Sequence, residues 1–574
     1  MLTPFHYAFV QRGAVEALLL AIPAGLLGTW IVLRGLAFFS HAVGTAAFPG
    51  LVLADGLGWP GPGGAGLAAA AYTLGVDRLA ARRESDRDTL TGLVLVGALA
   101  LGVVLASDVF HSGSNVETLL FGSLLLVGPD DVRLAAVAAA VTTVAAALFG
   151  RRWLAAGFDD ATARSMGVRV GAYDALLLAL VAFAVVAALS AVGALLAAAL
   201  FVVPAATARL LVRRLVPLQL ASVGLAALES VAGLWLSVEL NVPPGPAIAV
   251  LAGGVFAVAA LVARVPRGAV ALALVVLLAG CGGSSSSDGK LRVVATTTQI
   301  ADWMREVGGP DVDVHQILQP NTDPHEYEPR PRDVEAVARA DLVFENGDGL
   351  DAWMDKVVAQ AGTHPRVMVL GEFVPVKLPG ESSGPERSRF DPHWWHDPRN
   401  ADAAVFAMGA ELILADAKHG KHGPAFARRG RAYRATLEAL DRKLRACFAR
   451  IPPRERNLVT DHDAFGYFAH RYGLRVVGAV IPSQTTQAQP SAGETARLVA
   501  LIRREHVRAV FPESSLNRNL AETIARESGA RSDLTLYGDT LGPAGSPGAT
   551  YLGMERTNAD AIAQGLSGGR VSCR

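Results

Sequence analysis

Lysine is absent from the first 268 residues of this chain. That stretch carries 16 arginines and 15 acidic residues, so about 12% of it is charged, against about 24% of residues 269–574. A mean hydropathy of +0.35 is high for a soluble protein, and the apolar first part accounts for it. The composition excludes a single soluble globular domain and a disordered chain. It predicts a membrane protein joined to a soluble one.

Net charge and several common motifs are lacking as well. The formal net charge of zero gives no electrostatic reason to expect a nucleic-acid partner. Three cysteines in 574 residues are too few for a disulfide scaffold. The sequence has no Gly-rich phosphate-binding loop, so the chain is not itself an ATPase, and it has no H-E-x-x-H zinc-enzyme motif.

Apolar runs fill the first half of the chain. Each approaches the ~20 residues that cross ~30 Å of hydrocarbon, and we expect an all-α polytopic domain of eight to ten spans. Residues 118–127 are too short to span and would suit a re-entrant segment. The clear runs are residues 13–33, 36–53, 63–80, 90–106, 134–149, 172–190, 191–203, 218–236 and 247–263.

Small residues and arginines give these runs further meaning. Glycine and alanine allow close helix packing in lipid, and Pro23, Pro49 and Pro204 are expected to kink or interrupt helices, which suits a transporter bundle. Arginines cluster at residues 78–87 and 151–169 and again near 209–214 and 264–267. The positive-inside rule therefore places these loops in the cytoplasm.

A short polar segment at 159–168 precedes two apolar runs and the motif P-A-A-T-A-R-L at 204–210. With these features, residues 157–211 resemble the permease subunits of ABC importers for zinc and manganese, and the resemblance extends over residues 5–264. It implies a permease homodimer with a separate cytoplasmic ATP-binding subunit, which docks on the polar segment. The residues expected to couple to that subunit are Asp159, Asp160, Arg164 and Gly167.

One position departs from that family. Many members carry an aspartate four residues before the histidine of the S-H-A motif, whereas this chain has Ala37 before His41. A histidine inside a membrane span is a functional candidate by default. Without its carboxylate partner, His41 leaves ion binding and helix packing equally open.

Residues 264–289 read as a signal segment in the middle of the chain. Arg264 and Arg267 precede a short apolar run, and L-A-G-C at 278–281 resembles the bacterial lipoprotein signal, in which the cysteine is lipidated. A Ser/Gly tether follows at 282–289. We expect lipidation at Cys281; the alternative is one more membrane helix with an incidental cysteine.

From residue 291 onward, short β-rich runs alternate with helical segments. Two lobes of α/β type are therefore expected, joined by a long helix near residues 425–450. The first set of expected strands lies at 291–297, 312–318, 341–345 and 367–370, and the second at 457–460, 474–481, 508–511 and 535–537.

Three histidine motifs follow or end these strands: P-H-E-Y-E-P at 324–329, D-P-H-W-W-H-D-P at 391–398 and H-D-A-F-G-Y-F at 462–468. Loops at the carboxyl ends of strands converge in α/β sheets, and three imidazoles favour zinc or another borderline transition ion over Mg²⁺ or Ca²⁺, which prefer oxygen ligands. For each histidine alone, a surface or capping role is the commoner case.

Together the motifs resemble the zinc- and manganese-binding solute receptors of ABC importers. The resemblance runs from residue 291 to about 566 and implies metal ligation by His325, His393 and His462, with Asp539 as the late carboxylate ligand. Manganese receptors usually carry glutamate at the position of His462, so the histidine favours zinc. His396 stands where relatives have an apolar residue, and we expect it beside the site or exposed rather than ligating.

Two cysteines remain once Cys281 is assigned to lipid. Cys447, near the end of the long helix, and Cys573, at the end of the chain, form an even pair in an exported domain. A disulfide between them is expected, with two free thiols as the alternative.

The sequence thus predicts a fusion of the two non-ATPase parts of a zinc ABC importer in the plasma (inner) membrane. Zn²⁺ is the cargo, captured on the extracytoplasmic face. Rival readings are a manganese importer, a membrane-tethered zinc hydrolase, and a receptor joined to its neighbour by a missed stop codon.

The expected boundaries are a permease at 1–264, a signal and tether at 265–289 and a receptor at 290–574. Within the receptor we expect an N-lobe at about 290–400, a bridging helix at about 424–450 and a C-lobe at about 455–574.

Overall fold

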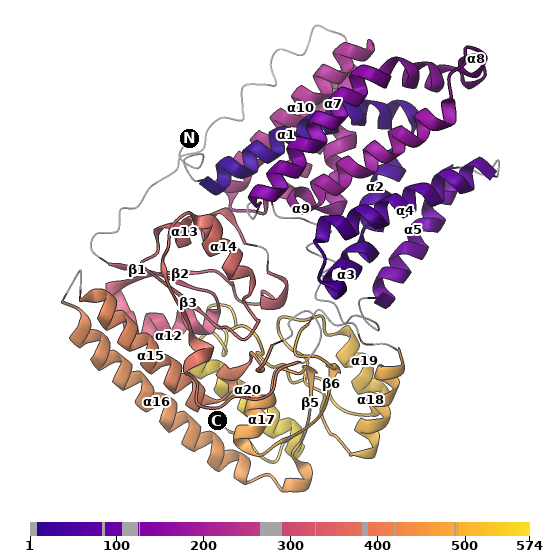
Figure 1. Ribbon diagram of the computed structural model, residues 1–574. Helices are drawn as coiled ribbons and strands as arrows, with labels where there is room; N and C mark the ends of the chain where they lie inside the picture. The colour runs from indigo at the N-terminus through magenta and orange to yellow at the C-terminus, as the bar shows by residue number, and fades with distance from the viewer. Residues whose placement is uncertain are drawn as a thin grey trace. The chain divides into compact units, whose positions relative to one another are not determined.

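The chain divides into two compact units, a helical N-terminal unit and a C-terminal unit of α/β type (Figure 1). The computed structural model describes residues 8–82, 87–105, 124, 127–263, 290–327, 329–381, 388–417, 421–486, 490 and 492–573. The expected signal segment with Cys281, and most of residues 118–127, lie outside these ranges.

The N-terminal unit is a bundle of apolar helices. Six stretches of its described residues are long and apolar enough to cross a membrane, and two shorter apolar helices lie at residues 88–102 and 199–211. The helices are α1 (Ala8–Arg34), α2 (Ala37–Ala46), α3 (Phe48–Leu57), α4 (Gly61–Arg82), α5 (Arg87–Val104), α7 (Pro129–Phe158), α8 (Asp160–Ser165), α9 (Val170–Leu211), α10 (Leu215–Leu240) and α11 (Pro244–Val262).

Helix α9 reverses direction at Gly193, whose φ of 76° is open to glycine but strained for other residues. Asp174 near its start accepts a hydrogen bond from Arg34, and Arg209 near its end donates to the carbonyl of Val32 at 3.2 Å, so both ends of α9 lie at the same end of α1. A straight helix would place Asp174 and Arg209 ~50 Å apart. The two legs correspond to the separate runs expected at 172–190 and 191–203.

One of the three prolines accompanies a helix break, as expected. Helix α2 ends at Ala46 and α3 begins at Phe48, so Pro49 lies in the first turn of α3, where the missing N–H costs little. Pro23 and Pro204 lie inside helices and do not interrupt them, because neighbouring groups in a bundle can satisfy the freed carbonyl. Helix α9 breaks at Gly193 rather than at Pro204, because its reversal requires a positive φ.

The N-lobe of the C-terminal unit is built on a four-stranded parallel sheet with strand order β2-β1-β3-β4. Its core includes Trp303, Phe344 and Trp394, all buried. The strands are β1 (Leu291–Ala295), β2 (Val312–Gln316), β3 (Leu342–Glu345) and β4 (Arg366–Val369), and the helices are α12 (Thr298–Gly308), α13 (Pro331–Arg339) and α14 (Trp353–Ala361).

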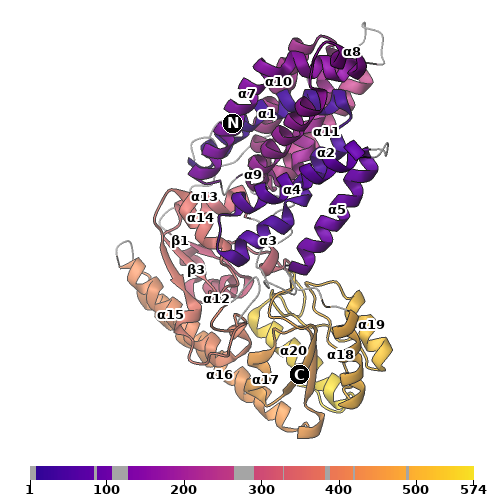
Figure 2. The same cartoon turned by 45° about the vertical axis from the view of Figure 1, so that its right-hand side comes forward.

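The C-lobe contains a parallel pair of strands, β5 (Asn457–His462) and β6 (Arg475–Ile481). The strands expected at 508–511 and 535–537 are wrong: these runs make only single bridges, among them Thr460 to Phe511 and Glu513 to Leu536. Pro512 follows the first run directly and has no N–H for a ladder. Helices α17 (Gly466–Tyr472), α18 (Ala492–Arg504) and α19 (Asn519–Ser528) complete the lobe (Figure 2).

One long helix, α16 (Gly423–Ala449), joins the two lobes, close to the expected boundaries. Its first half buries Phe426 and Leu437 in the N-lobe core, and its second half buries Leu444 and Phe448 in the C-lobe core. Helix α15 (Pro398–Asp416) runs beside it in both views (Figures 1 and 2). The final helix, α20 (Tyr551–Ser567), likewise contributes to both cores.

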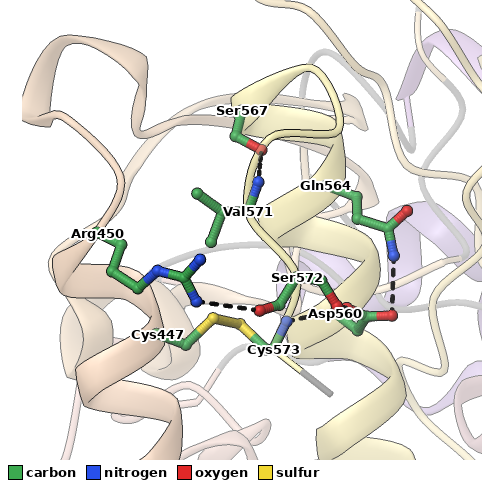
Figure 3. The surroundings of a disulfide bond; sticks show 8 residues. All are labelled: Cys447, Arg450, Asp560, Gln564, Ser567, Val571, Ser572 and Cys573. Atoms are coloured by element: carbon green, nitrogen blue, oxygen red, sulfur yellow. Dashed lines mark hydrogen bonds between the residues drawn. A yellow bond between two sulfur atoms is a disulfide. The ribbon is translucent and has the colours of Figure 1, made fainter.

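A disulfide between Cys447 and Cys573 fixes the end of the chain to the last turn of α16 (Figure 3). Arg450 donates to the carbonyl of Ser572 at 3.4 Å, and Asp560 on α20 accepts from the backbone N–H of Cys573 at 3.0 Å. The two sulfurs are 126 residues apart in sequence, so the bond closes a large loop.

Breaking this disulfide is expected to destabilise the C-terminal unit. Cys447→Ser should lower the free energy of unfolding of residues 290–574 by about 2–4 kcal/mol, because the unfolded chain regains the freedom of that loop. Urea unfolding measures the change. Cys573→Ser and the double variant should each match Cys447→Ser, whereas equal stability of wild type with and without reductant would contradict the prediction.

Candidate metal centre

Four polar side chains from separate segments of the C-terminal unit meet at one buried point. His325 lies in the short 3-10 turn η5 (Pro324–Glu326) after β2, His393 precedes the turn η7 (Trp394–His396), His462 ends β5, and Asp539 lies in the loop before α20. All four are buried, and one potential ligand atom from each lies within 4.8 Å of the others.

Local hydrogen bonds set the two loop histidines in place. Asp323 accepts from the backbone N–H of His325 at 2.9 Å, and Asp391 accepts from that of His393 at 2.9 Å. Each of these histidines also neighbours a proline, which limits the freedom of the backbone. Trp395 Nε1 donates to the carbonyl of Gly538 at 3.3 Å, which ties the second loop to the residue before Asp539.

The ring nitrogens of the three histidines lie close to the carboxylate oxygens of Asp539. Asp539 Oδ1 lies 3.4 Å from Nε2 of both His393 and His462, and these two nitrogens lie 3.4 Å apart. Asp539 Oδ2 lies 3.6 Å from His325 Nε2. Zinc–nitrogen and zinc–oxygen bonds of ~2.0–2.2 Å give a tetrahedron with edges of ~3.3–3.6 Å. Contacts of this length, among ligand atoms that all lie within 4.8 Å of one another, let the four side chains share one small metal ion.

Two further carboxylates orient the imidazoles. Asp391 Oδ1 lies 2.7 Å from His393 Nδ1, and Glu513 Oε1 lies 2.8 Å from His462 Nδ1. A carboxylate on Nδ1 fixes the tautomer that directs Nε2 to the centre and makes that nitrogen more basic. From the sequence, Asp391 was not singled out as a partner of His393, although the Asp-Pro-His spacing was its visible signal.

Charge within this buried site is strongly coupled. Burial lowers the pKa of His462, but the carboxylates of Asp539 and Glu513 outweigh it and hold that pKa well above its usual value. The pKa of His393 is likewise raised, by Asp391 and Asp539 against the effect of burial. Burial raises the pKa of Asp539, yet His462 and the other imidazoles bring it well below its usual range.

His396 lies near the four but points elsewhere. It is fully buried, its Nδ1 lies 3.0 Å from Glu555 Oε1, and its ring stacks on Phe465 with centroids 4.4 Å apart. Burial, with the neighbouring charge of His393, lowers the pKa of His396 to about 3, while burial raises that of Glu555. The pair is therefore neutral and joins η7 to α20.

The predicted coupling residues surround α8, between α7 and α9. Asp159 caps α8 by accepting from the backbone N–H of Thr162 at 3.1 Å, Arg164 lies in its last turn, and Gly167 has a φ of 79° in the turn that follows. Asp160 is the first residue of α8. His41 lies on α2 and is half-buried.

The two units match different families. Residues 6–263 match the family described as "ABC 3 transport family", and residues 293–565 match "Zinc-uptake complex component A periplasmic". Among solved structures, the periplasmic zinc binding protein TroA from Treponema pallidum is similar at 32% identity, with a TM-score of 0.45, covering 48% of this chain and 99% of that one.

Two relatives of the receptor part are named for different metals. The iron ABC transporter substrate-binding lipoprotein MtsA of Streptococcus pyogenes serotype M1 is 32% identical, covering 51% of this chain and 94% of MtsA. The manganese-binding lipoprotein MntA of Bacillus subtilis (strain 168) is 33% identical, covering 50% of this chain and 95% of MntA. The chain therefore belongs to the metal ABC importers, as a permease of the ABC 3 transport family joined to a metal-binding solute receptor, and both parts are transport components rather than enzymes.

Proposed function

We propose that this chain takes up zinc. Its receptor part captures Zn²⁺ through His325, His393, His462 and Asp539 on the extracytoplasmic face. Its permease part, as a homodimer with a separate ATP-binding subunit, moves the ion across the plasma (inner) membrane. The observation that carries the proposal is the donor set, three imidazole nitrogens and one carboxylate whose ligand atoms all lie within 4.8 Å of one another, since zinc prefers four such nitrogen and oxygen ligands.

The choice of zinc over manganese rests on ligand chemistry, because the relatives are named for several metals. Manganese suits carboxylate and carbonyl oxygens, whereas imidazole suits zinc. His462 supplies nitrogen where a manganese receptor would supply a second carboxylate. A zinc hydrolase would need a coordination position left open for water. The burial of Asp539 among the three imidazoles opposes that reading, as do the transport families.

Docking of the ATP-binding subunit is proposed at α8. Phe158 and Met166, at either end of this helix, are 91% and 74% exposed, so two large apolar side chains are open to a partner beside an arginine-rich loop. The two apolar side chains stand on either side of the turn that Asp159 caps, so a partner could bury both of them against a fixed backbone. Asp160, Arg164 and Gly167 complete this docking surface.

The order of the segments supports an outer receptor. Arg264 and Arg267 suit the cytoplasmic side, so the apolar run that follows would bring Cys281 to the outer face. We propose a permease at residues 1–264, a lipoprotein signal with its tether at 265–289 and the receptor at 290–574. Processing at Cys281 would make two proteins from one precursor, with the receptor held by lipid beside its permease.

Exchange of one ligand tests the metal preference. In His462→Glu a carboxylate replaces an imidazole, so Zn²⁺ should bind at least about tenfold more weakly relative to Mn²⁺. Competition calorimetry on residues 290–574 measures the ratio. His422→Ala is the control: it removes a half-exposed histidine bound to Asp416 and should leave the ratio of Zn²⁺ to Mn²⁺ affinity unchanged. Wild-type proteoliposomes that import Mn²⁺ as readily as Zn²⁺ would contradict the zinc assignment.

Zinc affinity should fall as the pH falls. The ion needs neutral imidazoles, and the raised pKa values of His462 and His393 mean that the empty site holds protons which zinc must displace. The apparent affinity should drop about tenfold per pH unit for each proton released. The same raised values stabilise the metal-free receptor at low pH, and that stability is lost as the pH rises through them. Calorimetry in buffers of different ionisation enthalpy counts the protons; none released would refute the scheme.

Cys281→Ala separates a precursor from a permanent fusion. If the segment is processed, the substitution should block lipidation and turn two bands into one on blots probed with antibodies to each half. The physical reason is that the lipid-bearing cysteine becomes the new N-terminus on cleavage. A full-length band in wild-type membranes, unchanged by the substitution or by a lipoprotein-peptidase inhibitor, would show a permanent fusion.

A further inference from the structure

Arg34, the last residue of α1, lies unusually deep for a charged side chain. Its side chain is 13% exposed and forms an ion pair with Asp174, which is 14% exposed and lies near the start of α9. Its second terminal nitrogen donates to the carbonyl of Trp153 on α7 at 3.4 Å. One guanidinium thus holds the C-terminal end of α1 to two other helices at once.

Those two helices are the ones that flank α8. Ala156 of α7, Ala163 of α8 and Val170 of α9 form a buried apolar cluster of their own. Trp153 Nε1 donates to the carbonyl of Tyr173 at 2.9 Å, which links α7 directly to α9. The end of α7, α8 and the start of α9 therefore form one packed block, and Arg34 is bound to both of its arms.

The arginine fits this place closely. A Cβ added at Gly157 would lie 2.9 Å from Arg34 Cδ, so the stem of the arginine lies on α7 where only glycine leaves room. Arginine presents several donors in a rigid fork, so it reaches a carboxylate and a carbonyl together, whereas a lysine ammonium would reach one.

Beyond Arg34, α1 is packed against its neighbours without intervening side chains. A Cβ at Gly25 would lie 2.3 Å from the backbone nitrogen of Val223 on α10, and one at Gly28 would lie 2.1 Å from the carbonyl oxygen of Phe201 on α9. Thr29 Oγ1 also bonds to Ser222 Oγ at 3.4 Å. Backbones in direct contact shift together, because a close-packed interface has no slack to absorb movement.

We propose that Arg34 and Asp174 are positioning residues of transport. When the ATP-binding subunit moves α8, the ion pair carries that movement into α1, and the glycine contacts pass it to α10 and to the second leg of α9. This inference rests on the proposed docking at α8. It is independent of which metal is carried.

The test measures ions moved per ATP hydrolysed. The full-length chain, co-purified with its ATP-binding subunit, is reconstituted into proteoliposomes with Zn²⁺ as the probe. Arg34→Gln and Asp174→Asn should each lower the ratio of ions to ATP about tenfold, within the usual range of coupling between sites. Subunit co-purification and the ATPase rate should stay close to those of wild type, a pattern that simple destabilisation of the bundle would not give.

A double-mutant cycle tests whether the two residues act as one unit. The double variant should be no worse than either single variant, and Arg34→Lys should fall between Arg34→Gln and wild type. Arg133→Gln is the matched control, because it breaks an exposed pair with Asp130 at the opposite end of α7 and should leave the ratio unchanged.

Failure of this inference is distinct from failure of the docking proposal. An unchanged ratio in Arg34→Gln and Asp174→Asn, an additive double variant, or loss of the ATP-binding subunit in either single variant would each overturn the positioning role. Docking is read separately from Phe158→Asp with Met166→Asp. If the subunit still co-purifies with that variant, the docking surface on α8 is wrong, whatever Arg34 does.

Discussion

A carboxylate with no access to water is the constraint around which the receptor is arranged. Asp539 is fully buried, and an isolated buried charge is too costly to persist unless it is compensated. Three imidazoles surround it, and two of these are themselves backed by Asp391 and Glu513. The carboxylates therefore place negative charge at a point that is lined by imidazole nitrogens. A divalent cation at that point would neutralise the charge and accept the nitrogens as ligands, so the electrostatics of this core favour metal binding.

The site also constrains how the two lobes are placed, because its ligand side chains come from both of them. His325 and His393 belong to loops of the N-lobe, whereas His462 ends β5 and Asp539 follows the C-lobe bridges. Spacing of a few ångströms between the donors survives only if the lobes keep a fixed distance. Helix α16 supplies this rigidity, since its halves are buried in different cores, and α20 does the same from the other end of the chain. Far fewer dihedrals are free in such helices than in extended hinge strands.

The sequence was most informative where chemistry and local pattern coincide. The three histidine motifs, the long helix and most strands could be located because each is written in neighbouring residues. The errors came where distant contacts decide. Residues 508–511 read as a strand, yet in the structure they form only single bridges, with Pro512 directly after them. The reversal of α9 was placed by apolar length alone, and only the contacts of Asp174 and Arg209 with α1 identify Gly193 as the turning point. Asp391 was overlooked because its role depends on the direction of one imidazole nitrogen.

The role of Arg34 could not be predicted from the sequence for the same reason. Arg34 is one of 16 arginines in a stretch without lysine, and the positive-inside rule accounts for all of them equally. Arg133 shows what that rule alone produces, an exposed side chain paired within its own helix turn. Arg34 instead lies against Gly157 and binds a carboxylate and a carbonyl from two helices. Burying a charge at one end of a bundle is costly unless the charge is paired. Pairing with groups on two other helices, rather than charge alone, therefore distinguishes a residue that links helices from one that only orients the chain.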